Sequence, residues 1–441
     1  MGNLKRLFGT DGIRGLVNEE LTVDLVYKIG NALGRMYSGK YKKLLIARDT
    51  RNSGEMIEAA LSAGALSAGL NVEFCGVITT PALAYLTKSE KTLGVMISAS
   101  HNPANYNGIK VLAEGFKISD DDEIDIENLI LEREPEYVPY GEIGKMTSSH
   151  LKDKYIGYII SEYELNNIPY KIAIDVGHGS TGALIDRIFD TFNLKYDVYF
   201  NEPNGLNINE KCGSIHPDVL ANIIKNDGYD LGILFDGDGD RCLFIDKKGN
   251  LIDGDKLMAI NALKLKEKNR LKNNMVVATI MSNLGLEKFL ETHDIKLCRT
   301  AVGDKYVLEK MLSSNAKLGG EQSGHIIFLD KATTGDGIIT ALETLETLLY
   351  FGQDITSLTK KIPEYPQLLK NVSVKNKIAV MENKKLKKVI DEYTSLPNFR
   401  LVVRPSGTEH KIRIMAEGED KKLVHTVVNE LYEMIEEIDR Y

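Results

Sequence analysis

The chain has 441 residues, of which 43% are hydrophobic and 27% are charged, and its formal net charge is -8. This composition is typical of a soluble globular protein, and the negative balance argues against binding nucleic acid or anionic membranes through a basic face. At roughly 150 residues per domain, the length predicts about three or four domains.

Signals for a cellular compartment are few. The first residues, MGNLKRLFGTDGIRG, contain no apolar signal-peptide core, and no apolar run suggests a membrane span. The cysteines form no CxxC pair, which suits a reducing compartment better than a disulfide framework or a zinc site. They are Cys75, Cys212, Cys242 and Cys298. We therefore expect a cytoplasmic protein with no nucleic-acid or membrane partner.

Three segments repeat one pattern, in which a short apolar strand runs through a polar loop to a glycine and precedes a helical stretch. They are KKLLIARDTRNSG at 42–54, YKIAIDVGHGSTG at 170–182 and NNMVVATIMSNLG at 273–285. A second candidate strand follows each segment, and then a strand that opens with Leu-Gly at 93, 231 or 318. Such self-similarity indicates copies of one α/β unit with a mostly parallel sheet, whose functional loops lie at the carboxyl ends of its strands.

From about Tyr365 the pattern changes to strands, a Lys-rich amphipathic helix near 382–394 and a closing helix, which predicts a smaller α+β domain. Residues 132–144 and 364–367 are rich in Pro, Gly or charge and indicate linkers. The acidic run 119–127 suits either a helix start or a solvated face. The expected domains are 1–147, 148–250 and 251–364, all α/β, and 365–441, which is α+β.

The loop SASHNPANYNGIK, after the strand GVMIS, carries Ser100, His101 and Lys110 in one turn-rich segment. A serine hydroxyl is a poor nucleophile unless a base or an electrophilic environment assists it, and here an imidazole adjoins it and an ammonium follows in the same loop. An ordinary Ser/Asn-rich turn is the competing interpretation, because these side chains bond to turn backbone.

A second loop, DGDGDR at Asp236–Arg241, follows the apolar strand LGILF. Glycines let the backbone turn tightly, so the alternating carboxylates can surround one cation, and their repulsion favours such a counter-ion. Three side-chain ligands leave positions free for a phosphate oxygen, which suits Mg²⁺, and Arg241 could clamp the same phosphoryl group. An EF-hand would need Gly at Arg241 and Glu at Lys247, so a calcium-stabilised repeat protein or a solvated turn is the weaker alternative.

A third loop, GGEQSGH at 319–325, offers Glu321, Gln322, Ser323 and His325, whose side chains bond sugar hydroxyls or an amino group. A fourth, RPSGTE at 404–409, places a guanidinium beside small hydroxyl residues and a glycine, a composition suited to a phosphate. An ordinary turn is the alternative for both. GTDGIRG at 9–15 is a further glycine-hinged loop, with one cation at Arg14.

The segment GHGSTG at Gly177–Gly182 supports a different class of enzyme. It matches the GxGxxG pattern after the strand KIAIDV, with Glu202 about 20 residues on, as in an NAD-dependent oxidoreductase. The other two repeats carry ARDTRNSG and ATIMSNLG in this place, so the glycines also suit one version of a shared turn.

With SASHNPANYNGIK, DGDGDR, GEQSGH and RPSGTE in this order over the whole chain, the sequence resembles the α-D-phosphohexomutases. The resemblance implies three related α/β domains and a smaller C-terminal domain around a central cleft. It implies a phosphoserine that phosphorylates a hexose 6-phosphate to a 1,6-bisphosphate, which reorients and returns its other phosphoryl group. The segments GEQSGH, GTDGIRG and VGDKY are similar to the corresponding segments of the family members that interconvert glucosamine 6-phosphate and glucosamine 1-phosphate. Members of broader specificity, acting on mannose or glucose phosphates, are the alternative and typically differ where Gln322 stands.

The resemblance also assigns roles by position. The catalytic positions are Ser100, His101, Lys110, Arg14 and Arg241, with either His101 or Lys110 as the general base. The ligands of one Mg²⁺ per chain are Asp236, Asp238, Asp240 and the phosphate of Ser100. The substrate-binding positions are Glu321, Gln322, Ser323 and His325 in the sugar loop and Arg404, Ser406, Gly407 and Thr408 in the phosphate loop.

The resemblance further implies a small phosphosugar substrate and a hexose 1,6-bisphosphate, or an equivalent donor, that primes the serine. Relatives are often dimers or monomers, and we expect a homodimer. Two positions depart from the pattern: Lys305 stands in VGDKY where glucosamine-acting members usually have Arg, and His410 follows RPSGTE where Pro is common. An ammonium cannot reproduce the planar fork of a guanidinium, so a phosphate contact at Lys305 would be altered.

Overall fold

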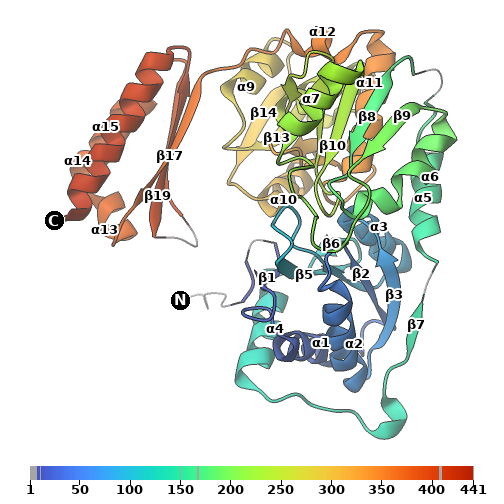
Figure 1. Ribbon diagram of the computed structural model, residues 1–441. Helices are drawn as coiled ribbons and strands as arrows, with labels where there is room; N and C mark the ends of the chain where they lie inside the picture. Colours follow the sequence, from blue (N-terminus) through green and yellow to red (C-terminus); the bar gives the residue numbers. More distant parts are fainter. Residues whose placement is uncertain (1–6, 10, 149, 166–167, 407–409, 441) are drawn as a thin grey trace.

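Four β-sheets organise the chain (Figure 1). The structure is a computed structural model and describes residues 7–9, 11–148, 150–165, 168–406 and 410–440. The sheets contain seven, five, four and three strands. With their helices they form what we call the first, second and third α/β units and the C-terminal unit.

The first unit has the strand order β1-β5-β4-β2-β3-β7, with β6 paired to β5. Helices α1 and α2 cross closely: a Cβ at Gly30 would meet the carbonyl oxygen of Leu61 at 2.0 Å, so only glycine fits there. The strands are β1 (Ile13–Leu16), β2 (Lys43–Arg48), β3 (Asn71–Val77), β4 (Leu93–Ile97), β5 (Tyr106–Ala113), β6 (Phe116–Lys117) and β7 (Met146–Ser148), and the helices are α1 (Val23–Tyr37), α2 (Gly54–Ser67), α3 (Thr80–Glu90) and α4 (Asp120–Glu132), with a 3₁₀ turn at Tyr140–Glu142.

The second and third units are smaller, with sheet orders β12-β11-β10-β8-β9 and β14-β13-β15-β16. The second contains α5 (Lys152–Ser161), β8 (Lys171–Asp175), α6 (Ile185–Phe189), β9 (Lys195–Tyr199), α7 (Pro217–Asp227), β10 (Leu231–Phe235), β11 (Cys242–Asp246), β12 (Leu251–Ile252) and 3₁₀ turns at Ser180–Ala183 and Asp190–Phe192. The third contains α8 (Gly254–Glu267), a 3₁₀ turn at Lys272–Asn274, β13 (Met275–Thr279), α9 (Leu284–Glu291), β14 (Lys296–Thr300), α10 (Asp304–Ser314), β15 (Leu318–Gly320), β16 (Ile326–Phe328), α11 (Gly337–Phe351) and α12 (Ile355–Thr359).

The three α/β units repeat one strand arrangement. In each, the first strand of the repeat pairs in parallel with the second and with the third, and the third strand pairs antiparallel with the fourth. The sets are β2, β3, β4 and β5, then β8, β9, β10 and β11, and then β13, β14, β15 and β16. β4 and β10 are buried along their whole length, as the sequences LGVMI and LGILF predict for strands covered on both faces. The predicted repeat and fold class are therefore confirmed.

The acidic run after Lys117 starts a helix. The side chain of Ser119 accepts a hydrogen bond from the backbone N–H of Asp122 and caps α4, whose first turn is acidic. Carboxylates are stabilised there because the N-terminus of a helix carries a partial positive charge. The run is therefore a helix start, and its residues Asp120, Asp121 and Asp125 are also exposed to solvent.

The C-terminal unit is an antiparallel sheet, β17-β19-β18, packed against helices. Its apolar core is separate, whereas one continuous apolar core joins residues of all three α/β units. Figure 1 shows this unit standing apart from the others. Its elements are β17 (Gln367–Ser373), α13 (Lys377–Glu382), α14 (Lys384–Thr394), β18 (Phe399–Pro405), β19 (Lys411–Gly418) and α15 (Lys421–Arg440).

A few polar contacts join the C-terminal unit to the third unit. The side-chain amide of Asn283 donates to the carbonyl oxygen of Tyr365 at 2.9 Å and accepts from the N–H of the same residue at 3.1 Å. Arg400 donates to the carbonyl oxygen of Ser282 at 2.8 Å. A joint made of so few contacts suits a hinge between two separately packed bodies. Among the described helices, none has the length and apolar character needed to cross a bilayer.

Candidate active site

The polar loops that the sequence singled out follow equivalent strands of the repeat. Ser100 lies after β4, the DGDGDR loop after β10 and the GEQSGH loop after β15. Backbone hydrogen bonds hold the DGDGDR segment against the third unit: Cys242 N–H donates to the carbonyl oxygen of Gly324 in the GEQSGH loop, and Gly337 N–H, at the start of α11, donates to the Gly239 carbonyl oxygen, both at 3.0 Å. One structural position, used three times, thus forms one polar centre.

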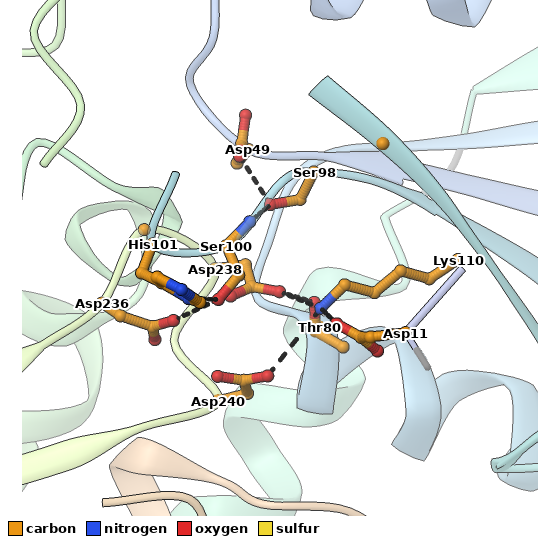
Figure 2. Close-up of polar contacts among 12 residues, drawn as sticks. Asp11, Asp49, Thr80, Ser98, Ser100, His101, Lys110, Asp236, Asp238 and Asp240 are labelled. Atoms are coloured by element: carbon orange, nitrogen blue, oxygen red, sulfur yellow. Dashed lines mark hydrogen bonds and ion pairs between the residues drawn. The ribbon is translucent and has the colours of Figure 1, made fainter. Parts of the chain in front are cut away.

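Ser100 is 1% exposed and its hydroxyl faces the second unit (Figure 2). Its Oγ donates to Asp236 Oδ2 at 2.6 Å and lies 3.4 Å from Nδ1 of His101. Its backbone has φ of 51°, in the left-handed region that residues with a side chain seldom adopt. The turn therefore aims the hydroxyl across the boundary between the two units.

Among the described residues, the three aspartates of DGDGDR form a group of carboxylates that could hold a metal ion. One carboxylate oxygen from each lies within 4.8 Å of the others, and all three residues are buried. Burial and the charges of Asp240 and Asp238 raise the pKa of Asp236 well above its ordinary value. Asp238 Oδ1 and Asp240 Oδ1 are buried and have no hydrogen-bond partner in the described part of the chain. Repelling carboxylates with free oxygens fit a divalent cation such as Mg²⁺.

Lys110 reaches this cluster from β5. Its Nζ lies 2.8 Å from Asp238 Oδ2, 2.8 Å from Asp11 Oδ2 and 3.8 Å from Asp240 Oδ2. Burial favours the neutral amine, but the electrostatic attraction of these carboxylates outweighs burial and raises the pKa of Lys110 above its usual value. The ammonium form therefore prevails while Lys110 faces Asp11 and Asp238.

His101 is the other residue that the sequence resemblance makes a candidate for proton transfer. Burial, with the positive charges of Arg241 and Arg14, lowers its pKa to about 4. The imidazole is therefore neutral at physiological pH and keeps a lone pair on one ring nitrogen. Of the two candidate bases, it is the one that can accept a proton in this arrangement.

Two contacts at the centre were not predicted. Asp11 pairs with Lys110, Lys117 and Arg14, whose charges outweigh burial and hold its pKa well below the ordinary value. Thr80, at the start of α3, donates through Oγ1 to Asp238 Oδ2 at 2.5 Å. GTDGIRG was a usable signal for Asp11, whereas no local signal connects Thr80 with a loop more than a hundred residues away.

The arginines flank the cluster. Arg14 lies on β1 and forms an ion pair with Asp11. The backbone N–H of Arg241 donates to Asp236 Oδ1 at 3.2 Å, and its Nε, 3.9 Å from Asp240 Oδ1, has no hydrogen-bond partner among the described residues. Both side chains are partly exposed, at 25% and 21%, so each guanidinium can still take an anionic group.

The GEQSGH loop presents its side chains beside this centre. Ser323 Oγ donates to Glu321 Oε2 at 3.4 Å, and Gln322 Nε2 donates to Asp253 Oδ2 at 3.3 Å. His325 Nε2 accepts from the Gly335 N–H at 3.2 Å, and Nδ1 of the same ring is buried without a partner in the described residues. These groups leave donors and acceptors for a polar ligand.

The phosphate loop lies in the C-terminal unit. Arg404 is the last residue but one of β18, and Ser406 N–H donates to the Lys411 carbonyl oxygen at 2.8 Å. Gly407 and Thr408 lie outside the described residues. β18, which carries Arg404, belongs to the C-terminal unit, and this unit stands apart from the three α/β units in Figure 1.

The two departures from the family pattern have defined surroundings. Lys305 Nζ pairs with Asp120 Oδ2 of α4 at 2.5 Å, so its ammonium bridges the third and first units. His410 is exposed, and its carbonyl oxygen accepts from the Val374 N–H at 2.9 Å. Neither contact depends on the residue that family members usually have there, which is Arg at position 305 and Pro at position 410.

The glycines of GHGSTG pack against protein. A Cβ at Gly179 would meet the carbonyl oxygen of Gly237 at 2.5 Å, and Ser180 N–H donates to the same oxygen at 2.9 Å. The backbone of the DGDGDR loop therefore fills the place that a dinucleotide phosphate would need. Gly179 thus serves the close approach of two loops, and a Cβ at Gly182 would meet Asn201 Oδ1 at 1.9 Å.

Comparison with known proteins gives concordant matches over the chain. Models of the phosphoglucomutase/phosphomannomutase family match residues 5–136 (α/β/α domain I), 153–249 (domain II), 253–365 (domain III) and 369–434 (C-terminal domain). The phosphoglucosamine mutase of Thermosipho africanus is 48% identical over 436 residues, covering 98% of this chain and 99% of its own.

Solved structures show the same architecture. A phosphoglucomutase/phosphomannomutase family protein from Burkholderia thailandensis superposes with a TM-score of 0.85 at 23% identity, covering 98% of this chain and 97% of its own. Aspergillus fumigatus N-acetylphosphoglucosamine mutase, solved with GlcNAc-6P and magnesium, has a TM-score of 0.66 at 15% identity, covering 99% and 97%. At these identities the likeness concerns the fold.

Proposed function

Since the chain belongs to the phosphoglucomutase/phosphomannomutase family and is a mutase, we propose that it interconverts glucosamine 6-phosphate and glucosamine 1-phosphate through a phosphoryl group carried on Ser100. The observation that carries the proposal is the buried Ser100 hydroxyl, 2.6 Å from an acidic trio with free oxygens. A nucleophile beside a cation site and arginines is what phosphoryl transfer requires, because that reaction depends on positioning and charge neutralisation.

The reaction has two transfers. The phosphoryl group on Ser100 passes to the C1 hydroxyl of the 6-phosphate: the new sugar O–P bond forms, the Ser100 O–P bond breaks, and the hydroxyl proton moves to a base. The resulting 1,6-bisphosphate reorients and its 6-phosphoryl group returns to Ser100 Oγ: the Ser100 O–P bond forms, the sugar O6–P bond breaks, and O6 takes the proton from the base, which leaves glucosamine 1-phosphate. A hexose 1,6-bisphosphate supplies the first phosphoryl group. Each cycle restores the enzyme.

The residues divide this work. Asp236, Asp238 and Asp240, with an oxygen of the Ser100 phosphate, are suited to hold one Mg²⁺. Bound there, the ion neutralises charge on the phosphoryl group. Arg241 offers a guanidinium to the same oxygens.

Proton transfer falls to the residues around Ser100. His101, neutral because of its lowered pKa, can take the hydroxyl proton, whereas the Lys110 ammonium can stabilise negative charge on the transferred group. Arg14 pairs with Asp11, and Asp11 in turn pairs with Lys110. We therefore favour His101 over Lys110 as the base.

Sugar recognition is assigned to Glu321, Gln322, Ser323 and His325. Exchanging Gln322 for Met removes the amide that contacts Asp253, and should lower kcat/KM for glucosamine 6-phosphate relative to glucose 6-phosphate by about tenfold, because a polar contact to substrate is lost. Steady-state rates with glucosamine, glucose and mannose 6-phosphates measure the change. Gln353→Met, at an exposed position after α11, is the control. Identical preference profiles in all three proteins would remove Gln322 from sugar recognition.

The C-terminal unit must move for its loop to hold the distal phosphate. Adding glucose 1,6-bisphosphate should lower the radius of gyration, because Arg404 and Ser406 have to approach the centre around Ser100. Small-angle scattering with and without the bisphosphate measures this closure. Arg404→Gln, which loses the guanidinium, should close less. Superimposable profiles for the wild type would exclude the movement.

A phosphorus NMR assay tests the function. The protein is mixed with Mg²⁺, a trace of hexose 1,6-bisphosphate and, in separate tubes, glucosamine, mannose or glucose 6-phosphate. Fastest appearance of a 1-phosphate signal with glucosamine supports the proposal, and faster turnover of mannose or glucose moves the protein to a broader phosphomannomutase/phosphoglucomutase specificity. No turnover in any tube, with the bisphosphate intact, refutes mutase action on these sugars. We expect a cytoplasmic homodimer, and light scattering on the eluted protein tests the oligomeric state.

A further inference from the structure

Arg51 is the largest fully buried side chain of the described residues, and it lies directly behind the Ser100 loop. A guanidinium carries five N–H donors and is costly to bury unless they are paired. Here its Nε donates to Asp49 Oδ2 at 2.9 Å. The remaining nitrogens donate to carbonyl oxygens of a single loop, those of Ser100, Asn102, Pro103 and Tyr106.

The planar fork of the guanidinium suits this arrangement. Nη2 reaches the carbonyl oxygens of Ser100 and Asn102, both at 2.8 Å, and Nη1 reaches that of Tyr106 at 3.0 Å. These residues span the loop from the nucleophile to the start of β5. One rigid side chain thus ties the whole loop to the end of β2.

A second donor approaches from the second unit. Nδ2 of Asn209 donates to the carbonyl oxygen of Ser100 at 2.9 Å and to that of Asn102 at 3.3 Å. The backbone N–H of Asn209 donates to the Gly177 carbonyl oxygen at 2.9 Å, which fastens it to the loop after β8. The Ser100 carbonyl oxygen therefore receives donors from both units.

The backbone N–H of Ser100 is held as well (Figure 2). This N–H donates to Ser98 Oγ at 2.9 Å, and that hydroxyl donates to Asp49 Oδ2 at 2.6 Å, on the carboxylate that also binds Arg51. A residue with φ of 51° keeps that conformation only when its surroundings determine it. With both its N–H and its C=O fixed, the Cα–Cβ bond of Ser100 is fixed too, and this bond sets where its hydroxyl lies relative to Asp236.

From this geometry we propose that Arg51 is a positioning residue for phosphoryl transfer, and that Asn209 performs the same task from the second unit. The inference rests on the proposed function, because it concerns the serine that carries the phosphoryl group. Arg51 acts through the loop backbone and lies behind the nucleophile, so its loss should slow the chemical step and leave substrate binding unchanged. A displacement of the nucleophile by about 1 Å can cost about 10²-fold in rate.

Arg51→Lys tests the proposal. Lysine keeps the charge beside Asp49 but has one nitrogen, which cannot reach all the carbonyl oxygens of the loop. We expect kcat for glucosamine 6-phosphate to fall about 10²-fold with KM unchanged. The rate at which glucose 1,6-bisphosphate labels Ser100, followed by mass spectrometry of the Ser100 peptide, should fall by the same factor. A structural role alone would lower the thermal midpoint without this selective loss in kcat.

Arg48→Gln is the matched control. Arg48 lies at the end of the same strand and pairs with Glu55 at 2.9 Å, away from the Ser100 loop. Its loss should leave kcat and labelling as in the wild type. Wild-type kcat in Arg51→Lys, an equal loss of kcat in Arg48→Gln, or a raised KM with unchanged kcat would each overturn the proposal.

Asn209→Ala keeps the test decisive if Arg51→Lys does not fold. It removes one hydrogen-bonding group from the Ser100 carbonyl oxygen while Arg51 and Asp49 remain paired. We expect kcat to fall about tenfold with KM unchanged, and wild-type kcat would overturn the proposal. The labelling assay separates the two inferences: no phosphate on wild-type Ser100 refutes the proposed function, whereas a labelled wild type with unimpaired variants refutes the positioning role alone.

Discussion

Replacing Ser100 with alanine is expected to abolish mutase turnover and leave the fold intact. The proposed route needs a side-chain oxygen that accepts the phosphoryl group and later releases it, and alanine has none. We expect the rate to fall by about 10⁴-fold or more, as when other enzymes lose a covalent nucleophile. Turnover is measured by phosphorus NMR with glucosamine 6-phosphate and a trace of bisphosphate. Mass spectrometry of the tryptic peptides reports phosphate on residue 100.

The fold should tolerate this exchange. Ser100 Oγ donates a short hydrogen bond to Asp236, a carboxylate whose pKa is raised by burial among like charges. Alanine removes this polar contact and no apolar group, so the surrounding apolar packing stays in place. Ser62→Ala is the control, because it removes another buried hydroxyl, which donates to the Glu58 carbonyl oxygen within α2. The control should turn over at the wild-type rate. Wild-type-like turnover in Ser100→Ala would falsify the phosphoserine route.

Replacing Asp238 with asparagine is expected to weaken activation by Mg²⁺ sharply. Asp238 Oδ2 already accepts from Lys110 and Thr80, and Oδ1 is buried without a partner among the described residues, so Oδ1 is the oxygen available to a cation. Asparagine removes the charge at nearly the same size. Loss of a group that merely supports a metal ligand costs about 10–100-fold in affinity, and loss of the ligand charge itself should cost at least as much.

Titration of activity against Mg²⁺, after treatment with EDTA, measures this shift. The wild type should lose activity with EDTA and regain it with Mg²⁺, while Asp238→Asn should need a much higher concentration. Asp230→Asn is the matched control, because Asp230 is exposed and lies just before β10, at the opposite end of the strand that leads into DGDGDR. An unchanged Mg²⁺ titration in Asp238→Asn would reduce DGDGDR to a structural turn.

The loops that carry chemistry could be found in the sequence because each is contiguous. The aspartates of DGDGDR are two residues apart and follow a fully apolar strand, so one short segment contains both the candidate metal ligands and the signal for where they lie. The repeat could be found for the same reason, since its strands and loops recur at similar intervals. The GxGxxG pattern in GHGSTG left an oxidoreductase as an alternative because a motif of glycines indicates a close approach without naming the approaching group, and at Gly179 that group is the backbone of Gly237.

Sequence patterns thus predict the repeated α/β units, the smaller C-terminal unit and the loops at the carboxyl ends of the strands. Which side chains meet follows from the packing of these units. Lys110 lies between Asp11 and Asp238, and the Ser100 carbonyl oxygen lies between Arg51 and Asn209. Strand periodicity and turn composition are local properties, whereas these contacts join residues up to 128 positions apart. They arise when packed sheets bring the ends of distant strands together, because burial of the apolar strands, and not the polar groups themselves, sets that arrangement.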